Sequence, residues 1–361
     1  MNRVFINGRY LTQAITGVQR CATETVRALD QLIAEGEYPP DAWSFTLLVP
    51  PSAPRPALQG IAVRAVGRGQ GQWWEQLHLP RHTGDGILLS FANVAPLAAR
   101  LQCVTIHDAS VFAVPDAYRV TFRTWYRFLL PALGRRADRV LTDSCFSRAE
   151  LIRWAGIPEH KLAVIPLAGE HILAAPPDPA VLTRNDLGQR PYILAVSSGS
   201  PHKNLAGVAR AVQLTRAHHY NLVLVGGRNS EVFSDSGDQS DNRIRPLGYV
   251  SDPELRALYE NAACLLYPSL YEGFGLPPLE AMTCGCPVIA SNTASLPEVC
   301  GDAALYCDPR DSSDIALRIR EILDQPELRQ SLRQRALTRS EKFRWSATAR
   351  GVMAEVREVV R

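Results

Sequence analysis

Short apolar runs alternate with longer amphipathic stretches along most of the chain. In the first half, residues 3–6, 45–49 and 103–106 have the length and the branched apolar side chains typical of buried strands. The alternation restarts in the second half with residues 192–196 and 221–225. Strands that alternate with helical segments predict a parallel sheet covered by helices. The sequence therefore predicts an α/β protein with two doubly wound domains.

The restart of this pattern also locates the domain boundary. A chain of 361 residues is too long for a single core. Residues 171–179 have the alanine- and proline-rich composition of a linker. We expect a first domain over residues 1–172 and a second over residues 180–344.

Composition narrows the function classes. Hydrophobic residues make up 46% and charged residues 21% of the chain, as in soluble globular proteins. No apolar run approaches the ~20 residues of a membrane span, and the first residues lack the apolar core of a signal peptide. The eight cysteines include no C-x-x-C pair, and a net charge of +3 is too small to indicate nucleic-acid binding. We expect a cytoplasmic protein with reduced cysteines and no nucleic-acid partner.

Two carboxylates, Glu272 and Glu280, flank a turn rich in glycine and proline. Gly273 and Gly275 let the backbone approach a ligand closely, and Pro277 suits the first turn of a helix. Such a helix directs N–H groups and partial positive charge at the loop, which favours a phosphate there. A phosphate site between two hydroxyl-binding carboxylates fits a nucleotide sugar. The alternative is an ordinary strand–loop–helix unit with incidental acids.

Three further candidates lie beside predicted strands or helices. Gly17 stands where the first strand–helix loop enters its helix, a position at which a phosphate can meet the helix N-terminus. His107 follows the strand at residues 103–106, at the sheet edge where open α/β sheets bind ligands. Lys203 stands at a helix start, where its charge opposes the dipole unless an anion lies between them. A structural role remains the alternative for the glycine and the histidine.

Residues 118–136 form the most distinctive predicted helix. Its apolar residues follow helical spacing, and Arg119, Arg123 and Arg127 form a cationic row. One interpretation is a helix packed on its own domain with a solvated arginine face. The other is contact with an anionic membrane surface or a lipid-linked acceptor.

The Glu-x7-Glu pattern of Glu272 and Glu280, with the residues around it, resembles retaining glycosyltransferases of family 4, which have the GT-B architecture. Similar motifs extend over essentially the whole chain and look most like the mannosyltransferase B-like subgroup of polysaccharide and O-antigen assembly. These motifs are Thr16 to Arg20, Trp74 to Gln76, Ile106 to Asp108 and His202 to Asn204. The resemblance implies two Rossmann-like domains facing a cleft. It also implies a C-terminal helix, about residues 345–361, that crosses back to the first domain.

The same resemblance implies residue roles. His107 would position hydroxyls, and Glu272 would bind the transferred sugar and support its developing positive charge. The implied donor-binding residues are Gly17, Lys203, Val250, Phe274, Gly275, Leu276 and Glu280, with Lys203 on the diphosphate, Glu280 on the ribose and Val250 reading the base through its backbone. The family's usual loop arginine near Lys203 is absent here; Arg228 or another basic residue could replace it.

Family chemistry implies retention at the anomeric carbon, a nucleotide-sugar donor and a saccharide or lipid-linked acceptor. The sequence has no Asp-x-Asp, so we expect no metal and no cofactor. GDP-mannose is the subgroup's usual donor. The alternatives are a UDP- or dTDP-sugar donor, an epimerase- or phosphorylase-like enzyme on the same fold, and a non-catalytic scaffold in a polysaccharide assembly complex.

Overall fold

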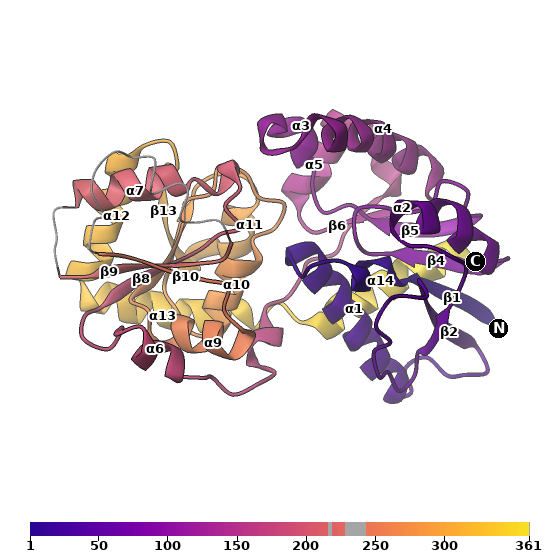
Figure 1. The fold of residues 1–361 in the computed structure, drawn as a ribbon, viewed down its shortest axis with the longest axis horizontal. Helices are drawn as coiled ribbons and strands as arrows, with labels where there is room; N and C mark the ends of the chain where they lie inside the picture. The colour runs from indigo at the N-terminus through magenta and orange to yellow at the C-terminus, as the bar shows by residue number, and fades with distance from the viewer. Residues whose placement is uncertain (216–218, 228–242, 361) are drawn as a thin grey trace. The chain divides into compact units, whose positions relative to one another are not determined.

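The alternating pattern produces two parallel sheets, one in each of two units (Figure 1). The computed structural model describes residues 1–215, 219–227 and 243–360. Unit 1 comprises Met1–Leu167 and Trp345–Arg361, and unit 2 comprises Ala168–Arg344. The predicted α/β class with two doubly wound domains is confirmed.

The unit boundary differs from the prediction. Unit 1 ends at Leu167 rather than after residue 172. The short 3-10 segment η6 (Glu170–Leu173) belongs to unit 2 because Ile172 is buried in that unit's core. The whole stretch that has a linker-like composition, residues 171–179, is therefore part of unit 2.

Unit 1 has a seven-stranded sheet within the described residues, in the order β3-β2-β1-β4-β5-β6-β7. Every neighbouring pair is parallel. The strands are β1 (Asn2–Asn7), β2 (Trp43–Val49), β3 (Ala62–Ala65), β4 (Ile87–Ser90), β5 (Leu101–Thr105), β6 (Arg139–Thr142) and β7 (Leu162–Val164).

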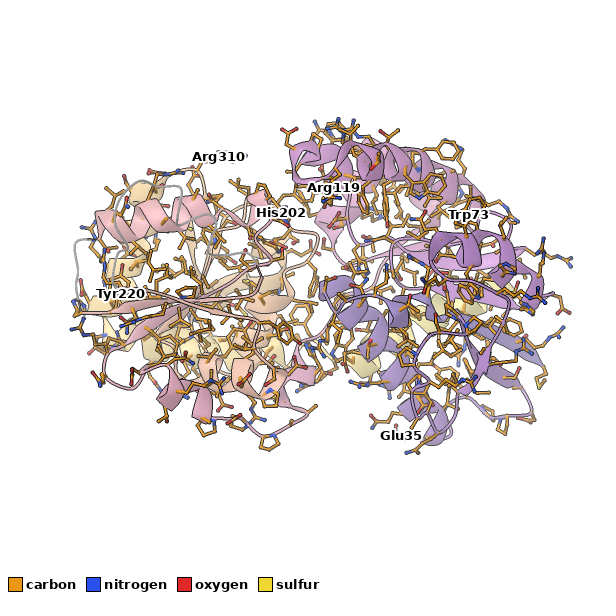
Figure 2. The ribbon with its side chains drawn as sticks, viewed as in Figure 1. Glu35, Trp73, Arg119, His202, Tyr220 and Arg310 are labelled. Atoms are coloured by element: carbon orange, nitrogen blue, oxygen red, sulfur yellow. The ribbon has the colours of Figure 1, made fainter. Side chains whose placement is uncertain are left out.

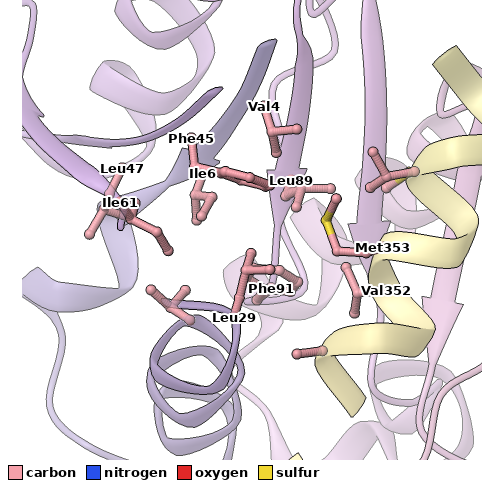
Figure 3. Close-up of a cluster of buried hydrophobic side chains, with 14 of the residues drawn as sticks. Val4, Ile6, Leu29, Phe45, Leu47, Ile61, Leu89, Phe91, Val352 and Met353 are labelled. Atoms are coloured by element: carbon pink, nitrogen blue, oxygen red, sulfur yellow. The ribbon is translucent and has the colours of Figure 1, made fainter. Parts of the chain in front are cut away.

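The helices of unit 1 include one from the far end of the chain. They are α1 (Gly17–Ala34), α2 (Gly71–Trp73), α3 (Ser110–Ala113), α4 (Val120–Arg136), α5 (Cys145–Ala155) and α14 (Trp345–Val360). Helix α14 packs against α1 (Figure 1). Figure 3 shows why: Leu29 of α1 and Val352 and Met353 of α14 share one buried cluster with strand residues such as Ile6 and Leu89.

Unit 2 has a six-stranded parallel sheet within the described residues, in the order β10-β9-β8-β11-β12-β13. The strands are β8 (Tyr192–Val196), β9 (Asn221–Val225), β10 (Ile244–Gly248), β11 (Cys264–Tyr267), β12 (Val288–Ser291) and β13 (Ala304–Cys307). The helices are α6 (Ala180–Arg184), α7 (Leu205–Leu214), α9 (Asp252–Asn261), α10 (Leu276–Thr283), α11 (Leu296–Cys300), α12 (Ser312–Asp324) and α13 (Pro326–Ser340).

The segment after α2 is irregular, with the π-helical turn η2 (Trp74–His78) and the 3-10 turn η3 (Leu79–His82) in place of one regular helix. Trp74 is buried, and its indole N–H donates to the carbonyl of Val66 at 2.7 Å, whereas Trp73 is exposed (Figure 2).

Within the described ranges, no helix has the length and hydropathy needed to span a membrane.

Candidate functional site

A lysine, a glutamate and a tyrosine meet at the carboxyl edge of the sheet in unit 2. The Lys203 Nζ donates to Glu272 Oε1 and to the Tyr267 hydroxyl, both at 2.7 Å. Tyr267 ends β11, Glu272 lies in the loop that follows, and Lys203 ends the 3-10 turn η7 (Pro201–Lys203) before α7. The carboxylate of Glu272 is therefore the anion that offsets the lysine's unfavourable position at a helix start.

Burial and pairing set the charges of this cluster. The side chains of Lys203 and Glu272 are 17% and 10% exposed. Burial alone would lower the pKa of Lys203, but the Glu272 carboxylate and the two hydrogen bonds raise it above its usual range. Burial would raise the pKa of Glu272, yet Lys203 brings it below its ordinary value. At neutral pH the pair is an ammonium and a carboxylate, and one Nζ proton is left over for a ligand.

The turn after Glu272 is built by a glycine with positive φ. Gly275 has a φ of 106°, and a Cβ there would come within 2.6 Å of the Leu296 side chain. Helix α10 begins at the next residue, Leu276. The hydroxyl of Ser295 donates to the carbonyls of Glu272 (3.0 Å) and Phe274 (2.8 Å) and so fixes the backbone of the turn.

The N-terminus of α10 offers fewer donors than the sequence suggested. Pro277 and Pro278 have no N–H, and the N–H of Leu279 donates to the Gly275 carbonyl at 3.4 Å. The helix dipole still points at the turn. A phosphate here would be met by backbone N–H groups at and before Leu276 and by the nearby lysine.

Glu280 lies one turn into α10 and is buried. Its Oε2 accepts from the Tyr259 hydroxyl at 3.1 Å, and its Oε1 lies 3.0 Å from Nε2 of His171. These contacts hold the Glu280 carboxylate in place at the start of α10.

The other predicted donor residues are less directly placed. Val250 is buried in the core of unit 2, so only its backbone could contact a ligand. His202 lies on η7 before α7 (Figure 2), and its carbonyl accepts from the N–H of Leu270 at 2.8 Å. Arg228, the suggested substitute for the absent loop arginine, lies outside the described residues.

In unit 1, His107 follows β5 and both of its ring nitrogens face acceptors. Nδ1 lies 2.6 Å from Oδ2 of Asp143, and Nε2 lies 2.9 Å from the carbonyl of Phe91. Burial would lower the pKa of His107, but the Asp143 carboxylate raises it; burial raises the pKa of Asp143 in turn. With both ring nitrogens engaged by acceptors, His107 has no ring nitrogen ready to take a proton from a substrate, which suits a positioning residue better than a general base.

Gly17 is the first residue of α1 and is exposed. The residue before it, Thr16, caps the helix reciprocally with Gln19, whose Oε1 accepts from the Thr16 N–H at 3.3 Å. The first turn of α1 is therefore a formed helix N-terminus without a side chain at Gly17. No group of three or more His, Cys, Asp or Glu side chains that could hold a metal occurs among the described residues.

The predicted residues fall into two groups. Lys203, Glu272 and Gly275 belong to unit 2, whereas His107 and Gly17 belong to unit 1. Sequence reasoning missed the partners of these residues: Tyr267, Asp143, Tyr259 and His171. The ends of β6 and β11 were the available signal, because polar residues at strand ends gather at one sheet edge.

Known proteins resemble the chain in sequence and in fold. Residues 183–339 match the family model described as glycosyl transferases group 1. The chain is 38% identical over 256 residues to the O-antigen chain mannosyltransferase B of Escherichia coli, covering 67% of this chain and 66% of that protein. It is 31% identical over 263 residues to the O-antigen chain mannosyltransferase RfbU of Salmonella typhimurium, covering 71% and 70%. The sucrose-phosphate synthase of Thermosynechococcus elongatus has a TM-score of 0.77 at 19% identity, covering 100% and 99%, which shows the fold alone.

Proposed function

Because the chain belongs to the glycosyl transferases group 1 family, we propose that it is a retaining hexosyltransferase of family 4. Its substrates are GDP-mannose and a saccharide or lipid-linked saccharide, in the synthesis of a bacterial cell-surface polysaccharide. The observation that carries this proposal is the Lys203–Glu272 pair beside the Gly275 turn at the N-terminus of α10. Both O-antigen relatives are named as mannosyltransferases, which supports mannose as the transferred sugar.

Each group of this site has a part in holding the donor. The diphosphate lies between the Lys203 ammonium and the backbone N–H groups around Gly275 and Leu276, with Phe274 packing the turn. Glu272 accepts hydroxyls of the mannose, and Glu280 accepts a ribose hydroxyl. The backbone at Val250 contacts the base. Gly17, on unit 1, is the exposed first residue of α1, a helix N-terminus without a side chain that suits a phosphate.

In the reaction, the bond between the anomeric carbon and the diphosphate oxygen breaks, and its electron pair leaves with GDP. The acceptor hydroxyl bonds to the same face of that carbon, and its proton passes to the departing phosphate oxygen. Lys203 and the backbone N–H groups are in place before the charge develops, so no reorganisation is required. Glu272 stabilises the positive charge on the sugar, and no metal or cofactor takes part.

The acceptor binds unit 1, where His107 holds Asp143 and the Phe91 backbone in place and so positions the groups that meet the acceptor hydroxyls. A UDP- or dTDP-sugar would use nearly the same residues, because Val250 can read the base only through backbone groups. The remaining alternative is a non-catalytic scaffold. The intact charged pair of Lys203 and Glu272 favours an enzyme, since a scaffold has no need of a buried charge pair at a helix N-terminus.

Helix α4 supports a peripheral site of action on the inner face of the cytoplasmic membrane. Val120 is 65% and Phe128 61% exposed. Arg119, at its N-terminal end (Figure 2), and Arg123 add positive charge beside them. The row is shorter than the sequence suggested, because Arg127 donates to carbonyls of the α3 segment. Apolar side chains beside two arginines suit the surface of an anionic bilayer.

A thermal-shift screen against GDP, UDP, dTDP and their sugar conjugates tests the donor. A ligand that binds only the folded protein raises its melting temperature. We expect GDP and GDP-mannose each to raise the melting temperature of the wild type. In Glu272→Gln, we expect GDP-mannose to raise the melting temperature less than GDP does. A shift with UDP or dTDP alone would move the proposal to that donor. No shift with any nucleotide would contradict the donor site and favour the scaffold.

A further inference from the structure

A second buried charge pair lies at the carboxyl edge of the sheet in unit 1. Arg9 follows β1 in the 3-10 segment η1 (Gly8–Thr12), and its Nε lies 3.0 Å from Oε2 of Glu75 on η2. Asn7 donates from Nδ2 to Oε1 of Glu75 at 2.6 Å and to the Ser90 hydroxyl at 3.2 Å. Arg9 is 6% exposed and Glu75 only 1%. Folding therefore buries the charged side chains of Arg9 and Glu75, which are distant in sequence from Glu272.

The outer end of the Arg9 guanidinium is still available. Among the described residues, the ion pair of Arg9 runs from Nε to Oε2 of Glu75, and this contact does not have the geometry of a hydrogen bond. The two terminal nitrogens form a rigid fork that can donate to two neighbouring oxygen atoms at once. In the part of the chain that the structure describes, no acceptor meets this fork, so it can donate to a ligand.

This pair continues the polar network of His107. Strands β1, β4, β5 and β6 are neighbours in the sheet. Asn7 and Ser90 join the ends of β1 and β4, and His107 joins the end of β5 to Phe91 and to Asp143 after β6. Strands are spaced about 4.8 Å apart, so the ends of β1 and β5 are about 10 Å apart. The two polar groups therefore share one edge of the sheet, within the length of a saccharide.

Charge decides between two kinds of ligand. Arg9 and Glu75 together are neutral, and the Tyr126 hydroxyl of α4 lies close enough to feel both charges. Burial raises the pKa of that hydroxyl, so it remains a neutral donor and acceptor. An anion at the fork would face the carboxylate of Glu75 in a dry site. Neutral hydroxyls can accept from the fork without that repulsion.

We propose that Arg9, held in place by Glu75, binds two neighbouring hydroxyls of the acceptor saccharide and so helps to select it. This inference rests on the proposed function, since it assigns the acceptor side of the same reaction. Arg9 is a binding residue for the acceptor, and Glu75 and Asn7 are positioning residues that act through it.

Octyl α-D-mannopyranoside is the probe, and its binding is measured by ligand-observed NMR in the presence of GDP, with and without Arg9→Lys. Lysine retains the charge but loses the fork. We expect octyl mannoside to bind about 10- to 100-fold more weakly, the range for hydrogen bonds from a charged donor. The GDP-induced melting shift should stay as in wild type, because GDP binds unit 2.

Two further variants keep the test sharp. Arg9→Met/Glu75→Gln removes both buried charges, so a loss of binding there cannot come from an unpaired buried carboxylate. Arg3→Gln is the matched control, because Arg3 lies in the preceding strand β1 in an exposed ion pair with Asp85. We expect weaker binding in the first variant and unchanged binding in the second.

Several outcomes overturn the proposal. Unchanged octyl mannoside binding by folded Arg9→Lys and by the double variant would do so, as would no binding to the wild type. An effect confined to mannose 6-phosphate would show that the fork recognises an anion instead. If no nucleotide sugar is turned over while Arg9 still governs octyl mannoside binding, the proposed transfer reaction fails and the saccharide site stands.

Discussion

Removing the charge of Lys203 should destabilise unit 2 through the carboxylate that it leaves behind. The Nζ lies 2.7 Å from Oε1 of Glu272 in a largely buried setting. At that distance the two charges attract by about 6 kcal/mol at an effective dielectric constant of about 20. Much of this offsets the loss of hydration of both groups. Removing one partner of such a pair costs about 3–5 kcal/mol, and we expect Lys203→Met to lower the free energy of unfolding by that amount.

The double variant Lys203→Met/Glu272→Gln separates the pair from the loss of a side chain. With both charges gone, no unpaired carboxylate remains, and we expect a coupling energy of about 2–3 kcal/mol between the two sites. Lowering the pH should reduce the difference in the free energy of unfolding between Lys203→Met and the wild type. The stabilisation from Glu272 in the wild type is present above the unfolded pKa of about 4.3 and lost as the pH falls through its lower folded pKa. In Lys203→Met, burial raises the pKa of Glu272, and protonation then relieves the buried charge.

The tryptophans allow the two units to be followed separately. All six, including Trp43 and Trp345, belong to unit 1, so their fluorescence reports that unit alone, whereas far-UV circular dichroism reports both. We expect the dichroism transition of unit 2 in Lys203→Met to move down by roughly 6 to 20 °C, with the fluorescence transition unchanged. An unshifted dichroism transition would refute the reasoning. So would a double variant as unstable as the sum of the two single ones.

Three other outcomes follow from local geometry. Gly275→Ala should weaken GDP binding in the thermal-shift assay and cost about 1–3 kcal/mol, because of its positive φ and a leucine side chain 2.6 Å from the new Cβ; Gly227→Ala, which meets open space, is the control. His107→Gln should cost most stability below about pH 6.5, the pKa of an unfolded histidine, because the folded pKa of His107 is raised. The stabilisation from His107 is lost as the pH rises through the folded pKa. Fluorescence melts in which the variant differs from the wild type equally at acid and at alkaline pH would contradict this. Replacing both Arg119 and Arg123 with glutamine should weaken the free energy of binding to phosphatidylglycerol vesicles by about 2 kcal/mol at low salt. Unchanged co-sedimentation with the vesicles would favour the interpretation of α4 as a helix with a solvated arginine face.

Patterns that are contiguous in sequence were predictable. The apolar runs gave the strands and the α/β class, since buried parallel strands need unbroken apolar stretches. The turn from Glu272 to Glu280 was predictable because glycine, proline and carboxylate types each have a local reason to be there. The irregular winding of residues 71–82 into α, π and 3-10 turns was not predictable, because it accompanies the burial of Trp74, whose indole donates to the carbonyl of Val66.

Contacts between distant parts of the chain were not predictable. Lys203 reaches Glu272 because β8 and β11 are neighbours in the sheet although β9 and β10 come between them in sequence. The pairing of Arg9 with Glu75 likewise depends on how η2 packs over the sheet edge. Composition placed the domain boundary too late, because it does not show that Ile172 is buried in unit 2.

The most direct test of the central claim is product analysis by mass spectrometry, with the anomeric linkage assigned by NMR, after incubation with GDP-mannose and octyl α-D-mannopyranoside, with and without EDTA. The account predicts octyl mannoside extended by one mannose in an α linkage, unaffected by EDTA. Glu272→Ala should still show a cooperative far-UV circular dichroism transition for unit 2, lowered because Lys203 loses its partner, and should form no product at temperatures below that transition. A product formed equally well by Glu272→Ala, or a β-linked product, would contradict the account.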